Sequence, residues 1–472
     1  MRAVDTLNAL AGRLPDGSVA TDPKTLTERA TDCWPLALLR RVRGEEPPAP
    51  AAVVFPASTE DVAEVLAWAG ETRTAVIPRG AGSGVCGGAQ AEAGAVVLDL
   101  SRMDRITGVD AVSQVVRVQA GVRGDRLEEF LAGHELTVGH YPQSIAISTV
   151  GGWIAASSAG QASTGFGAIE DMLLGFTAVL PGGEILTSRA VPRSAVGPDL
   201  RRLLIGSEGT LAVVTEATLA CRARPAGLDW LAFTFPDVPA LLDGLRDLTR
   251  AETGAVVIRG YDETDAMLSF GSLGHPGGCV AILAFPTDLW GQAERRRLAA
   301  QTVRQTGATG LDSAYGAHWW AHRNDAVGLF HQIMGPERAF GPGVVVDTME
   351  IAGLWSVVPE LYTGVRAGLA AHAEAVGCHI SHLYRSGASL YFTFLVRGAD
   401  DGDAEARYLA AWEQAVRSCG LMGGTFTHHH GVGRHKARFV AGEIGESGLG
   451  VLRRIKDALD PDQILNPRAL LP

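Results

Sequence analysis

The chain has 472 residues, of which 46% are hydrophobic and 20% charged, so it is of ordinary globular composition and long enough for two or three domains. Its formal net charge of −11 argues against non-specific binding to nucleic acid or to an anionic membrane. No apolar run approaches the roughly 20 residues needed to cross a bilayer, and the N-terminus lacks the pattern of a signal peptide. Six cysteines stand singly without a CxxC pair, which predicts reduced thiols and a cytoplasmic protein.

Residues 1–50 form a polar lead-in, and residues 51–222 then alternate strands and helices. In "STEDVAEVLAWAGE", Ser58 with Asp61 three residues later predicts a capped helix. "TAVIPRGAGSGVCGGAQ" predicts a short strand that runs directly into a glycine-rich loop, and "GAVVLDL" and "QVVRVQ" predict two further strands. The alternation predicts one domain over this region.

Residues 223–420 repeat helix and strand more regularly. "VPALLDGLRDLTRA" and "DLWGQAERRRLAAQTVRQTG" predict helices, whereas "GAVVIRGYD", "GGCVAILAFP" and "ASLYFTFLV" predict strands. This order favours an α+β cap domain with an antiparallel sheet. Residues 421–472 follow as a C-terminal segment, which carries "THHHGVGRHKARFV" and which we expect to return to the first domain.

The glycine-rich loop at residues 78–89 can present consecutive backbone N–H groups to a phosphate, because glycine has no Cβ to block the approach. Alone it is a weak signal that a mobile loop would also give. It has no Gly-Lys-Ser/Thr sequence, and no helix opens directly after it. Phosphate binding therefore needs support from other motifs.

Two further motifs supply that support. "STVGGWIAASSAG" and "DLRRLLIGSEGTLAVVTEATL" follow the loop in order, and together the three closely resemble the FAD-binding domain of the vanillyl-alcohol oxidase / p-cresol methylhydroxylase flavoprotein superfamily. The final "QILNPRALLP" resembles the C-terminal tail of the FAD-linked oxidases. The resemblance implies an α+β fold, with a two-part FAD-binding domain at residues 51–222 and a cap (substrate) domain at residues 223–420.

The resemblance also implies which residues contact FAD. Ser83 stands about where some relatives carry a histidine that tethers the flavin, and we interpret Cys86 as a small residue filling a tight loop, so non-covalent FAD is expected. The predicted cofactor contacts are Pro78, Arg79, Gly80, Ala81, Gly82, Ser83, Gly84, Gly88, Ser148, Thr149, Gly151, Gly152, Ala155, Ser158, Gly160, Glu208, Gly209, Val214 and Asn466.

A finer resemblance is to the alkyldihydroxyacetone-phosphate synthases and their bacterial look-alikes. It is carried by "YRSGASLYFTF" and "THHHGVGRHKARFV" in addition to the flavin motifs, and it implies that Arg259 in "VVIRGYD" and Tyr391 in "SLYFTF" are needed for activity. The chain departs from these synthases where His379 or Ser381 replaces an arginine. Packing of a sheet face is the alternative for Tyr391. Arg259, on an apolar strand, needs an oxyanion such as a carboxylate or phosphate.

We interpret three consecutive histidines, His428, His429 and His430, as an active-site strand in which one or two imidazoles move a proton or bind an anion. A packing or surface role stays open for at least one of them. No cysteine or well-placed carboxylate lies nearby in the sequence, so no metal is predicted. We expect most of the basic residues that follow, Arg434, His435, Lys436 and Arg438, to form a solvated helix start.

Three hypotheses follow for function. The first is an FAD-dependent oxidoreductase that oxidises a small anionic alcohol, such as a 2-hydroxy acid, by hydride transfer to flavin N5, with Arg259 and Arg323 binding the anion. The second is a synthase-like transferase that uses flavin N5 covalently without net redox change. The third is a flavin-binding protein without catalysis, which the combination of Arg259, Tyr391 and the histidines disfavours. Partners are expected to be a small anionic substrate and no nucleic acid or membrane, and the sequence leaves a homodimer open.

Overall fold

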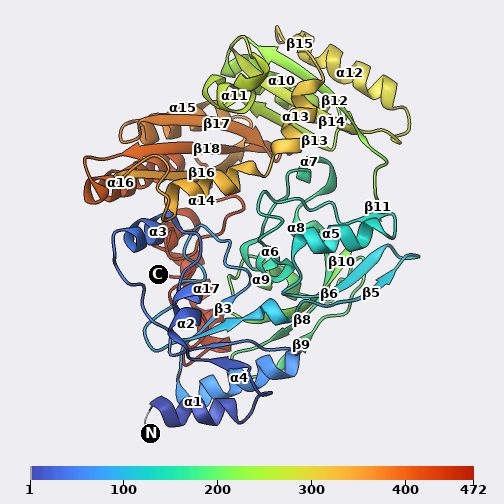
Figure 1. Ribbon diagram of the computed structural model, residues 1–472. Helices are drawn as coiled ribbons and strands as arrows, with labels where there is room; N and C mark the ends of the chain where they lie inside the picture. Colours follow the sequence, from blue (N-terminus) through green and yellow to red (C-terminus); the bar gives the residue numbers. More distant parts are fainter. Residues whose placement is uncertain (1–2) are drawn as a thin grey trace.

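The computed structural model describes residues 3–472, which form a lower part with two main sheets and an upper part with one large sheet (Figure 1). The first lower sheet has the strand order β1-β2-β4-β3, in which β2, β4 and β3 are parallel. Val54 and Val96 pack on one face toward α4, and Val53 and Val97 pack on the other toward α2, so this sheet is buried on both faces as parallel sheets are. Its elements are α1 (Ala3–Ala11), β1 (Val19–Ala20), α2 (Pro23–Arg29), β2 (Ala52–Val54), α4 (Thr59–Thr72), β3 (Val76–Arg79) and β4 (Val96–Asp99).

The second lower sheet is antiparallel, with the order β5-β6-β10-β8-β9. A two-stranded ribbon of β7 and β11 stands where the chain leaves for the upper part. The elements here are β5 (Ile106–Asp110), β6 (Val115–Gln119), α5 (Gly124–Ala132), β7 (Leu136–Thr137), α6 (Val150–Ala156), α7 (Ser163–Phe166), α8 (Ile169–Met172), β8 (Leu173–Val179), β9 (Ile185–Thr187), α9 (Leu200–Leu204), β10 (Val213–Ala220) and β11 (Arg222–Ala223).

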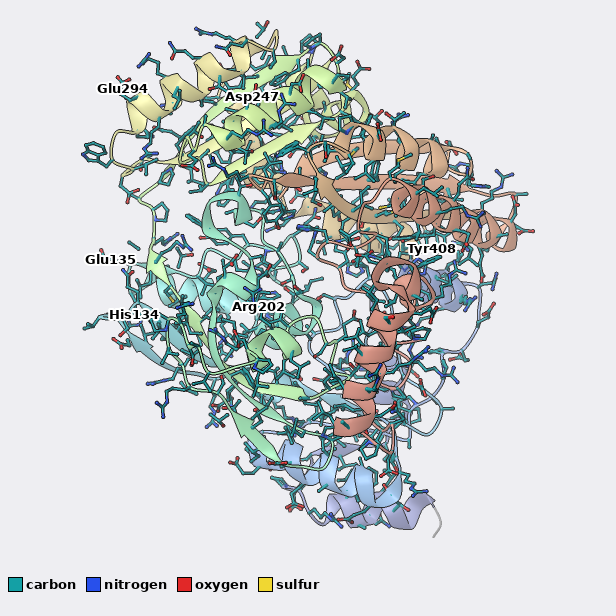
Figure 2. All side chains as sticks on the ribbon, turned by 180° about the vertical axis from the view of Figure 1, so that it is seen from behind. His134, Glu135, Arg202, Asp247, Glu294 and Tyr408 are labelled. Atoms are coloured by element: carbon teal, nitrogen blue, oxygen red, sulfur yellow. The ribbon has the colours of Figure 1, made fainter. Side chains whose placement is uncertain are left out.

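The upper part is a seven-stranded antiparallel sheet of order β15-β12-β14-β13-β17-β18-β16. Helices α10, α12, α15 and α16 cover one face, and the partly exposed Asp247 and the exposed Glu294, labelled in Figure 2, lie on α10 and α12. The elements are β12 (Leu228–Phe235), α10 (Val238–Arg250), β13 (Val257–Tyr261), α11 (Glu263–Phe270), β14 (Cys279–Pro286), α12 (Gln292–Arg304), β15 (Thr309–Leu311), α13 (Ala314–His322), α14 (Asp325–Met334), β16 (Val344–Leu354), α15 (Val358–Ala370), β17 (Ala375–Ser381), β18 (Gly387–Arg397) and α16 (Asp401–Leu421).

Segments from both ends of the chain connect the two parts. Near the N-terminus, α3 (Pro35–Val42) contributes Leu36 and Leu39 to the core of the upper part. After the upper part, α17 (Val440–Leu459) runs back down, and Leu465 forms a parallel bridge with Val76 of the first sheet. Within residues 3–472, no helix combines the length and apolarity that a membrane crossing requires.

The helix predicted from "STEDVAEVLAWAGE" is confirmed as α4. The Ser58 side chain accepts the Asp61 backbone N–H at 3.1 Å, and the Asp61 carboxylate accepts the Ser58 N–H at 3.2 Å, which is the reciprocal capping expected from the spacing. All six cysteines are free, as their scattered positions predicted.

Candidate active site

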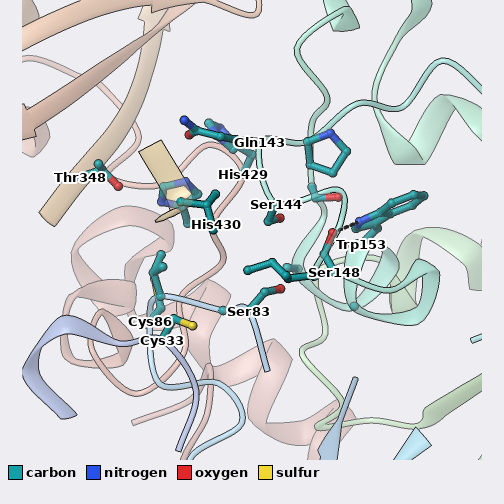
Figure 3. Close-up of a pocket in the computed structure, with 18 of the residues that line it drawn as sticks. Cys33, Ser83, Cys86, Gln143, Ser144, Ser148, Trp153, Thr348, His429 and His430 are labelled. Carbon is teal, nitrogen blue, oxygen red and sulfur yellow. Dashed lines mark hydrogen bonds between the residues drawn. The ribbon is translucent and has the colours of Figure 1, made fainter. Parts of the chain in front are cut away.

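A cavity of about 870 Å³ lies between the lower part and the inner face of the seven-stranded sheet (Figure 3). Its lower wall comes from the glycine loop, α6 and the turn before β10. Its upper wall comes from β13, β16, β17, β18, the helices α11, α13 and α14, and the histidine loop, residues 427–433. Three motifs far apart in the sequence thus share one cavity.

The glycine loop packs so closely on its neighbours that two of its glycines leave no room for a Cβ. Gly82 has φ +73°, and a Cβ there would lie 2.0 Å from the Arg79 guanidinium, while a Cβ on Gly80 would lie 2.4 Å from Thr149 Oγ1. Within the described chain, no backbone N–H of residues 80–88 donates a hydrogen bond to another backbone group or to a side chain. All of these residues except Gly87 line the cavity, and eight unpaired donors at such a wall are an arrangement that binds a phosphate-bearing ligand.

Helix α6 begins at this wall. Thr149 caps it by accepting the Gly152 N–H at 3.3 Å, and Ser148 Oγ accepts the Trp153 indole N–H at 2.8 Å. Both hydroxyls therefore organise the helix start, and each keeps its own O–H for donation. Gly151 packs tightly on Ala120, because a Cβ added to Gly151 would lie only 2.8 Å from the Ala120 Cβ. This close contact brings α6 against the end of β6.

Most of the residues predicted to contact the cofactor line this cavity, and two do not. Gly160 packs instead against the backbone of His140 and Tyr141. Asn466 lies behind the wall, where its amide donates to the carbonyls of Gly88 at 2.9 Å and Glu208 at 2.8 Å. The predicted residues that line the cavity are Pro78, Arg79, Gly80, Ala81, Gly82, Ser83, Gly84, Gly88, Ser148, Thr149, Gly151, Gly152, Ala155, Ser158, Glu208, Gly209 and Val214.

The upper wall carries a row of polar side chains fixed by strand register. Tyr261 pairs with His379, His379 with Tyr391, and Tyr391 with Glu350 across four adjacent strands. Directly opposed residues share a face, so all four lie on the inner face, as does Arg259 two residues before Tyr261. The sheet thereby collects groups from four separate sequence segments.

Arg259 is buried in this wall without an anionic partner. Its side chain is 6% exposed, its Nε donates to the Tyr261 hydroxyl at 3.1 Å, and its guanidinium lies 4.9 Å from the Trp319 ring centre. In residues 3–472 it forms no ion pair with a carboxylate, and it lines the cavity. A guanidinium in this state can bind an anion that enters the cavity, and that role stays a prediction.

His379 and Tyr391 stack beside Arg259, with ring centres 4.4 Å apart. His379 Nδ1 lies 3.0 Å from an Asp265 oxygen, yet burial and then the charge of Arg259 lower the pKa of His379 to about 4. Burial raises the pKa of Tyr391, so its phenol is protonated at neutral pH and acts as a hydrogen-bond donor. The Asp265–His379 contact was not found from the sequence, because 114 residues separate the two.

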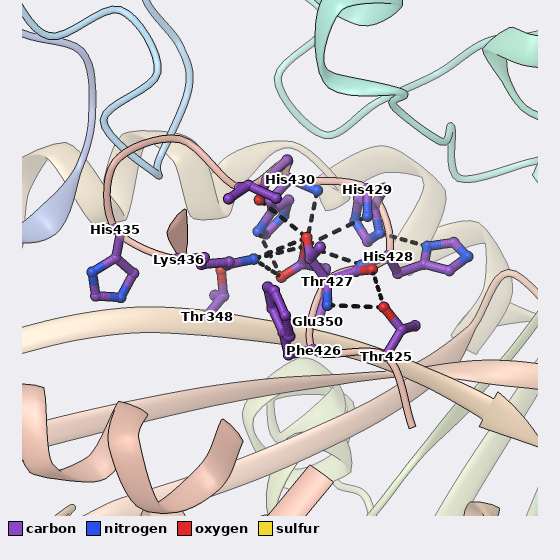
Figure 4. Close-up of polar contacts among 12 residues, drawn as sticks. Thr348, Glu350, Thr425, Phe426, Thr427, His428, His429, His430, His435 and Lys436 are labelled. Atoms are coloured by element: carbon purple, nitrogen blue, oxygen red, sulfur yellow. Dashed lines mark hydrogen bonds and ion pairs between the residues drawn. The ribbon is translucent and has the colours of Figure 1, made fainter. Parts of the chain in front are cut away.

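The histidine loop is a tight bend, and the prediction of a strand at His428–His430 is wrong. One oxygen of Glu350 accepts the backbone N–H groups of His430, His428 and His429 at 2.9, 3.3 and 3.4 Å (Figure 4). Successive N–H groups of a strand point in opposite directions, so three that converge on one atom require a bend. Gly431 and Gly433, both with positive φ, then turn the chain toward Cys86.

Glu350 is fully buried and paired with Lys436, whose Nζ lies 2.9 and 3.1 Å from its two oxygens. Burial alone would raise the pKa of Glu350, but His430, Lys436 and the hydrogen bonds it accepts bring the pKa to about 2. Glu350 also raises the pKa of Lys436 against desolvation, so both are charged. The expectation of a solvated basic segment is wrong for Lys436 and for the buried His435, and it holds for the half-exposed Arg438.

The three histidines divide between two cavities. His429 and His430 line the large cavity, and His430 Nδ1 lies 3.4 Å from Glu350 Oε2. His428 lines a second cavity of about 330 Å³ together with Tyr384 and Glu170. Burial lowers the pKa of all three, to about 4 for His428, so each is neutral at pH 7 and able to accept a proton.

Arg323 and the two tryptophans of α13 stand near Arg259. Arg323 stacks on Trp320 at 3.8 Å and lines the large cavity together with Trp319. Burial lowers the pKa of Arg323, and its Nε has no hydrogen-bond partner among the described residues. These positions are compatible with a second anion contact, and that role stays a prediction.

Comparison with known proteins gives the class. A family model described as "FAD linked oxidases, C-terminal domain" matches residues 225–470, and one described as "FAD binding domain" matches residues 50–189. The chain therefore belongs to the FAD-linked oxidases, whose cofactor is FAD. The eight unpaired N–H groups of the glycine loop that line the cavity fit the pyrophosphate of that cofactor.

The individual relatives differ in the activities that their names state. An alkyldihydroxyacetonephosphate synthase of Dictyostelium discoideum is 29% identical over 92% of this chain and 75% of its own. The FAD-linked oxidoreductase YgcU of Escherichia coli K12 is 30% identical over 90% of each chain, and the glycolate oxidase subunit GlcD of Bacillus subtilis is 26% identical over 89% and 88%.

Solved structures confirm the predicted fold class. An alkyldihydroxyacetonephosphate synthase superposes with a TM-score of 0.82 at 24% identity over 99% of this chain and 85% of its own. The p-cresol methylhydroxylase superposes with a TM-score of 0.78 at 16% identity over 99% and 96%. At these identities the likeness concerns the fold alone.

Proposed function

We propose that the protein oxidises a small anionic alcohol of the 2-hydroxy-acid type. The observation that carries the proposal is Arg259, a buried guanidinium without a carboxylate partner that faces the cavity beside His379 and Tyr391. A planar guanidinium binds a carboxylate through two parallel hydrogen bonds. A relative named as a glycolate oxidase subunit, which by its name acts on a 2-hydroxy acid, supports this substrate class.

The residues of the chain divide the work as follows. Arg259 binds the carboxylate and orients the hydroxyl-bearing carbon, while the Tyr391 phenol donates a hydrogen bond to a substrate oxygen. A neutral imidazole of His429 or His430 accepts the hydroxyl proton. The charge of the Glu350 carboxylate, 3.4 Å from His430 Nδ1 without a hydrogen bond between them, stabilises the protonated ring of His430. Bound FAD supplies the two-electron acceptor for the hydrogen on carbon.

An anaerobic absorbance titration tests the proposal. The yellow protein is titrated with D-lactate, glycolate, D-2-hydroxyglutarate, glycerol 3-phosphate and palmitoyl-dihydroxyacetone phosphate, with a redox dye as electron acceptor. We expect a hydroxy acid to bleach the oxidised flavin band and to pass electrons to the dye. Absence of bleaching with every hydroxy compound would contradict the proposed reaction.

Replacing Arg259 should affect binding of the anion most. For Arg259→Ala we expect a roughly 10- to 100-fold higher KM for the hydroxy acid, because charge-assisted bidentate hydrogen bonds are lost, with unchanged flavin content. Arg246 on α10, a partly exposed arginine that does not line the cavity, is changed to Ala as the matched control. Equal KM values for the two variants would refute the role of Arg259.

A synthase-like reaction is the second candidate. Apolar side chains, Leu268, Val327, Leu329, Phe330 and Ile333, line the α11–α14 end of the cavity and would accommodate an alkyl chain. Relatives named alkyldihydroxyacetonephosphate synthase support it. In the same titration, a spectral change with the acyl-phosphate ketone and no electrons reaching the dye would favour this candidate.

A further inference from the structure

A thin wall separates the large cavity from the second cavity. His429 lines the large cavity, His428 lines the second, and Ala159 lines both. The second cavity holds about 330 Å³ and is also lined by Tyr384 and Glu170. The two adjacent histidines therefore stand between the site of the chemistry and another compartment.

The wall contains a continuous hydrogen-bonded chain. His429 Nδ1 lies 2.9 Å from His428 Nδ1, and His428 Nε2 lies 2.8 Å from the Tyr384 hydroxyl. Tyr384 sits in the turn between β17 and β18 and is 42% exposed. At the opposite end, His429 Nε2 makes no hydrogen bond with the described residues. The chain thus ends at one side in an unbonded nitrogen of His429, a residue that lines the large cavity, and at the other in the hydroxyl of the exposed Tyr384.

The charge state of the two rings suits proton transfer. Because burial keeps both imidazoles neutral, each carries one N–H and one bare nitrogen. A hydrogen bond between two Nδ1 atoms requires that one donates and the other accepts. If His429 donates from Nδ1, its Nε2 is bare toward the cavity, and His428 then holds its proton on Nε2 and donates it to Tyr384.

We propose that His429, His428 and Tyr384 form a proton relay from the large cavity to the second cavity. The relay rests on the proposed oxidation, because that reaction releases the hydroxyl proton of the substrate. It also distinguishes between the two candidate bases, since His429 is the one joined by hydrogen bonds to an exit. His428, which does not line the large cavity, gains a role as the middle member.

One transfer moves one proton and leaves every ring neutral. The substrate O–H bond breaks and its proton bonds to His429 Nε2. The proton on His429 Nδ1 passes to His428 Nδ1, the proton on His428 Nε2 passes to the Tyr384 oxygen, and the original Tyr384 proton passes to water. One proton enters and one leaves, and each ring then regains its first tautomer by proton exchange with water before the next turnover.

Glu170 provides an acceptor at the exit. Its Oε2 is buried and has no hydrogen-bond partner among the described residues, and it lines the second cavity beside Tyr384. Burial raises the pKa of Glu170, which moves this carboxylate toward the range in which it exchanges protons with water. A buried, unpartnered carboxylate oxygen has few structural uses, and at this position it can receive the proton that leaves Tyr384.

A metal ion bound by the same histidines is the alternative to the relay. The imidazole nitrogens of His382, His428 and His429 lie within 4.8 Å of one another, as three ligands of a metal ion do. However, a tetrahedral zinc would hold its ligand nitrogens about 3.3 Å apart, whereas 2.9 Å between the two Nδ1 atoms is a hydrogen-bond distance. His382 Nδ1 is also already hydrogen-bonded to the Ser163 hydroxyl, at 2.6 Å. Metal content is therefore one readout of the test.

The first test concerns the hydrogen bonds and needs no turnover. In ¹⁵N-histidine-labelled holoenzyme, we expect a scalar coupling between the Nδ1 nuclei of His428 and His429 and a proton on His428 Nε2. Tyr384→Phe should shift the His428 resonances, whereas Tyr362→Phe, which removes a half-buried hydroxyl bonded to Asp262, should not. Absence of the coupling, or one transition-metal ion per chain, overturns the relay.

The second test concerns the rate. We expect Tyr384→Phe to bleach the flavin about tenfold more slowly with the hydroxy acid, Glu170→Gln to slow it as well, and small imidazole buffers to restore the Tyr384→Phe rate. Tyr362→Phe should behave as wild type. Wild-type rates for both Tyr384→Phe and Glu170→Gln overturn the relay. If no hydroxy acid bleaches the flavin, the proposed function fails, and the nitrogen couplings still decide the relay.

Discussion

Glu350 is the residue on which the histidine loop depends. It accepts three backbone N–H groups, the Thr427 hydroxyl at 2.7 Å and the Lys436 ammonium. For Glu350→Gln we expect a loss of about 3–5 kcal/mol of unfolding free energy, because a fully buried lysine is left without its counter-charge. Urea unfolding followed by tryptophan fluorescence measures the change.

A double variant separates stability from positioning at this site. Glu350→Leu with Lys436→Met removes both charges together, so most of the lost stability should return. The loop would still lack its carboxylate, and flavin bleaching by the hydroxy acid should stay slow. A double variant that recovers both stability and bleaching would show that Glu350 does not position the histidines.

At the residue scale, sequence resemblance predicted the side chains with family motifs, and it missed their partners. Arg259 and Tyr391 lie in segments that resemble family motifs, and Glu350 does not. An acidic residue within "VVVDTMEIAG" is nevertheless a signal, since a carboxylate on an apolar strand needs a buried partner. That partner, Lys436, lies 86 residues away, and only the fold brings the two together.

At the element scale, the glycine loop should be sensitive at Gly82. Alanine there would meet the Arg79 guanidinium and would need a positive φ, so we expect Gly82→Ala to lose most of its bound FAD. Gly94→Ala is the matched control, because Gly94 has φ +77° and nothing lies within 4 Å of its added Cβ. The ratio of flavin to protein absorbance measures occupancy, and equal ratios would contradict this reading of the loop.

Elements with strong local signals were predicted well. The capped helix α4 and the apolar strands β13, β14 and β18 follow from periodicity and capping alone. The 21-residue helix α16 was not predicted, although Asp400 caps it by accepting the Asp403 N–H. The bend of the histidine loop could not be predicted, because its cause is a carboxylate on another strand.

For the whole molecule, we expect the flavin to be held without a covalent bond. Acid precipitation of the yellow protein should leave a colourless pellet and a yellow supernatant. Ser83 and Cys86 both line the cavity, but burial raises the pKa of the Cys86 thiol well above its usual range, so it is a poor nucleophile. Flavin that remains in the pellet would contradict the prediction.

Buried imidazoles in both parts of the molecule make the fold sensitive to acid. Burial lowers the pKa of His140 to about 3, below an unfolded value near 6.5. The unfolded chain then binds more protons, so the contribution of His140 is complete above pH 6.5 and is lost as the pH falls toward 3. Opposing groups exist, since burial raises the pKa of Asp32 to about 6 and of Glu208 to about 7.

The contributions of Asp32 and Glu208 are the same in wild type and in a His140 variant, so they cancel when the pH dependences of the two are compared. Between pH 6.5 and pH 4, wild type should lose about 3 kcal/mol more unfolding free energy than His140→Gln, as urea titrations at each pH would show. His134→Gln, at an exposed position visible in Figure 2, should follow wild type. Parallel curves for wild type and His140→Gln would disprove the contribution of His140.

The overall fold was predictable because family motifs extend along most of the chain, and the solved relatives confirm it.

The order in which the chain is made has a consequence for the cofactor. Asn466 joins the carbonyl of Gly88, 378 residues earlier, to that of Glu208. At a synthesis rate of about 5–20 residues per second, the two hydrogen bonds of Asn466 can form only roughly 20–75 s after the glycine loop has been translated. A nascent chain thus carries the glycine loop long before Asn466 can bridge it to the turn before β10.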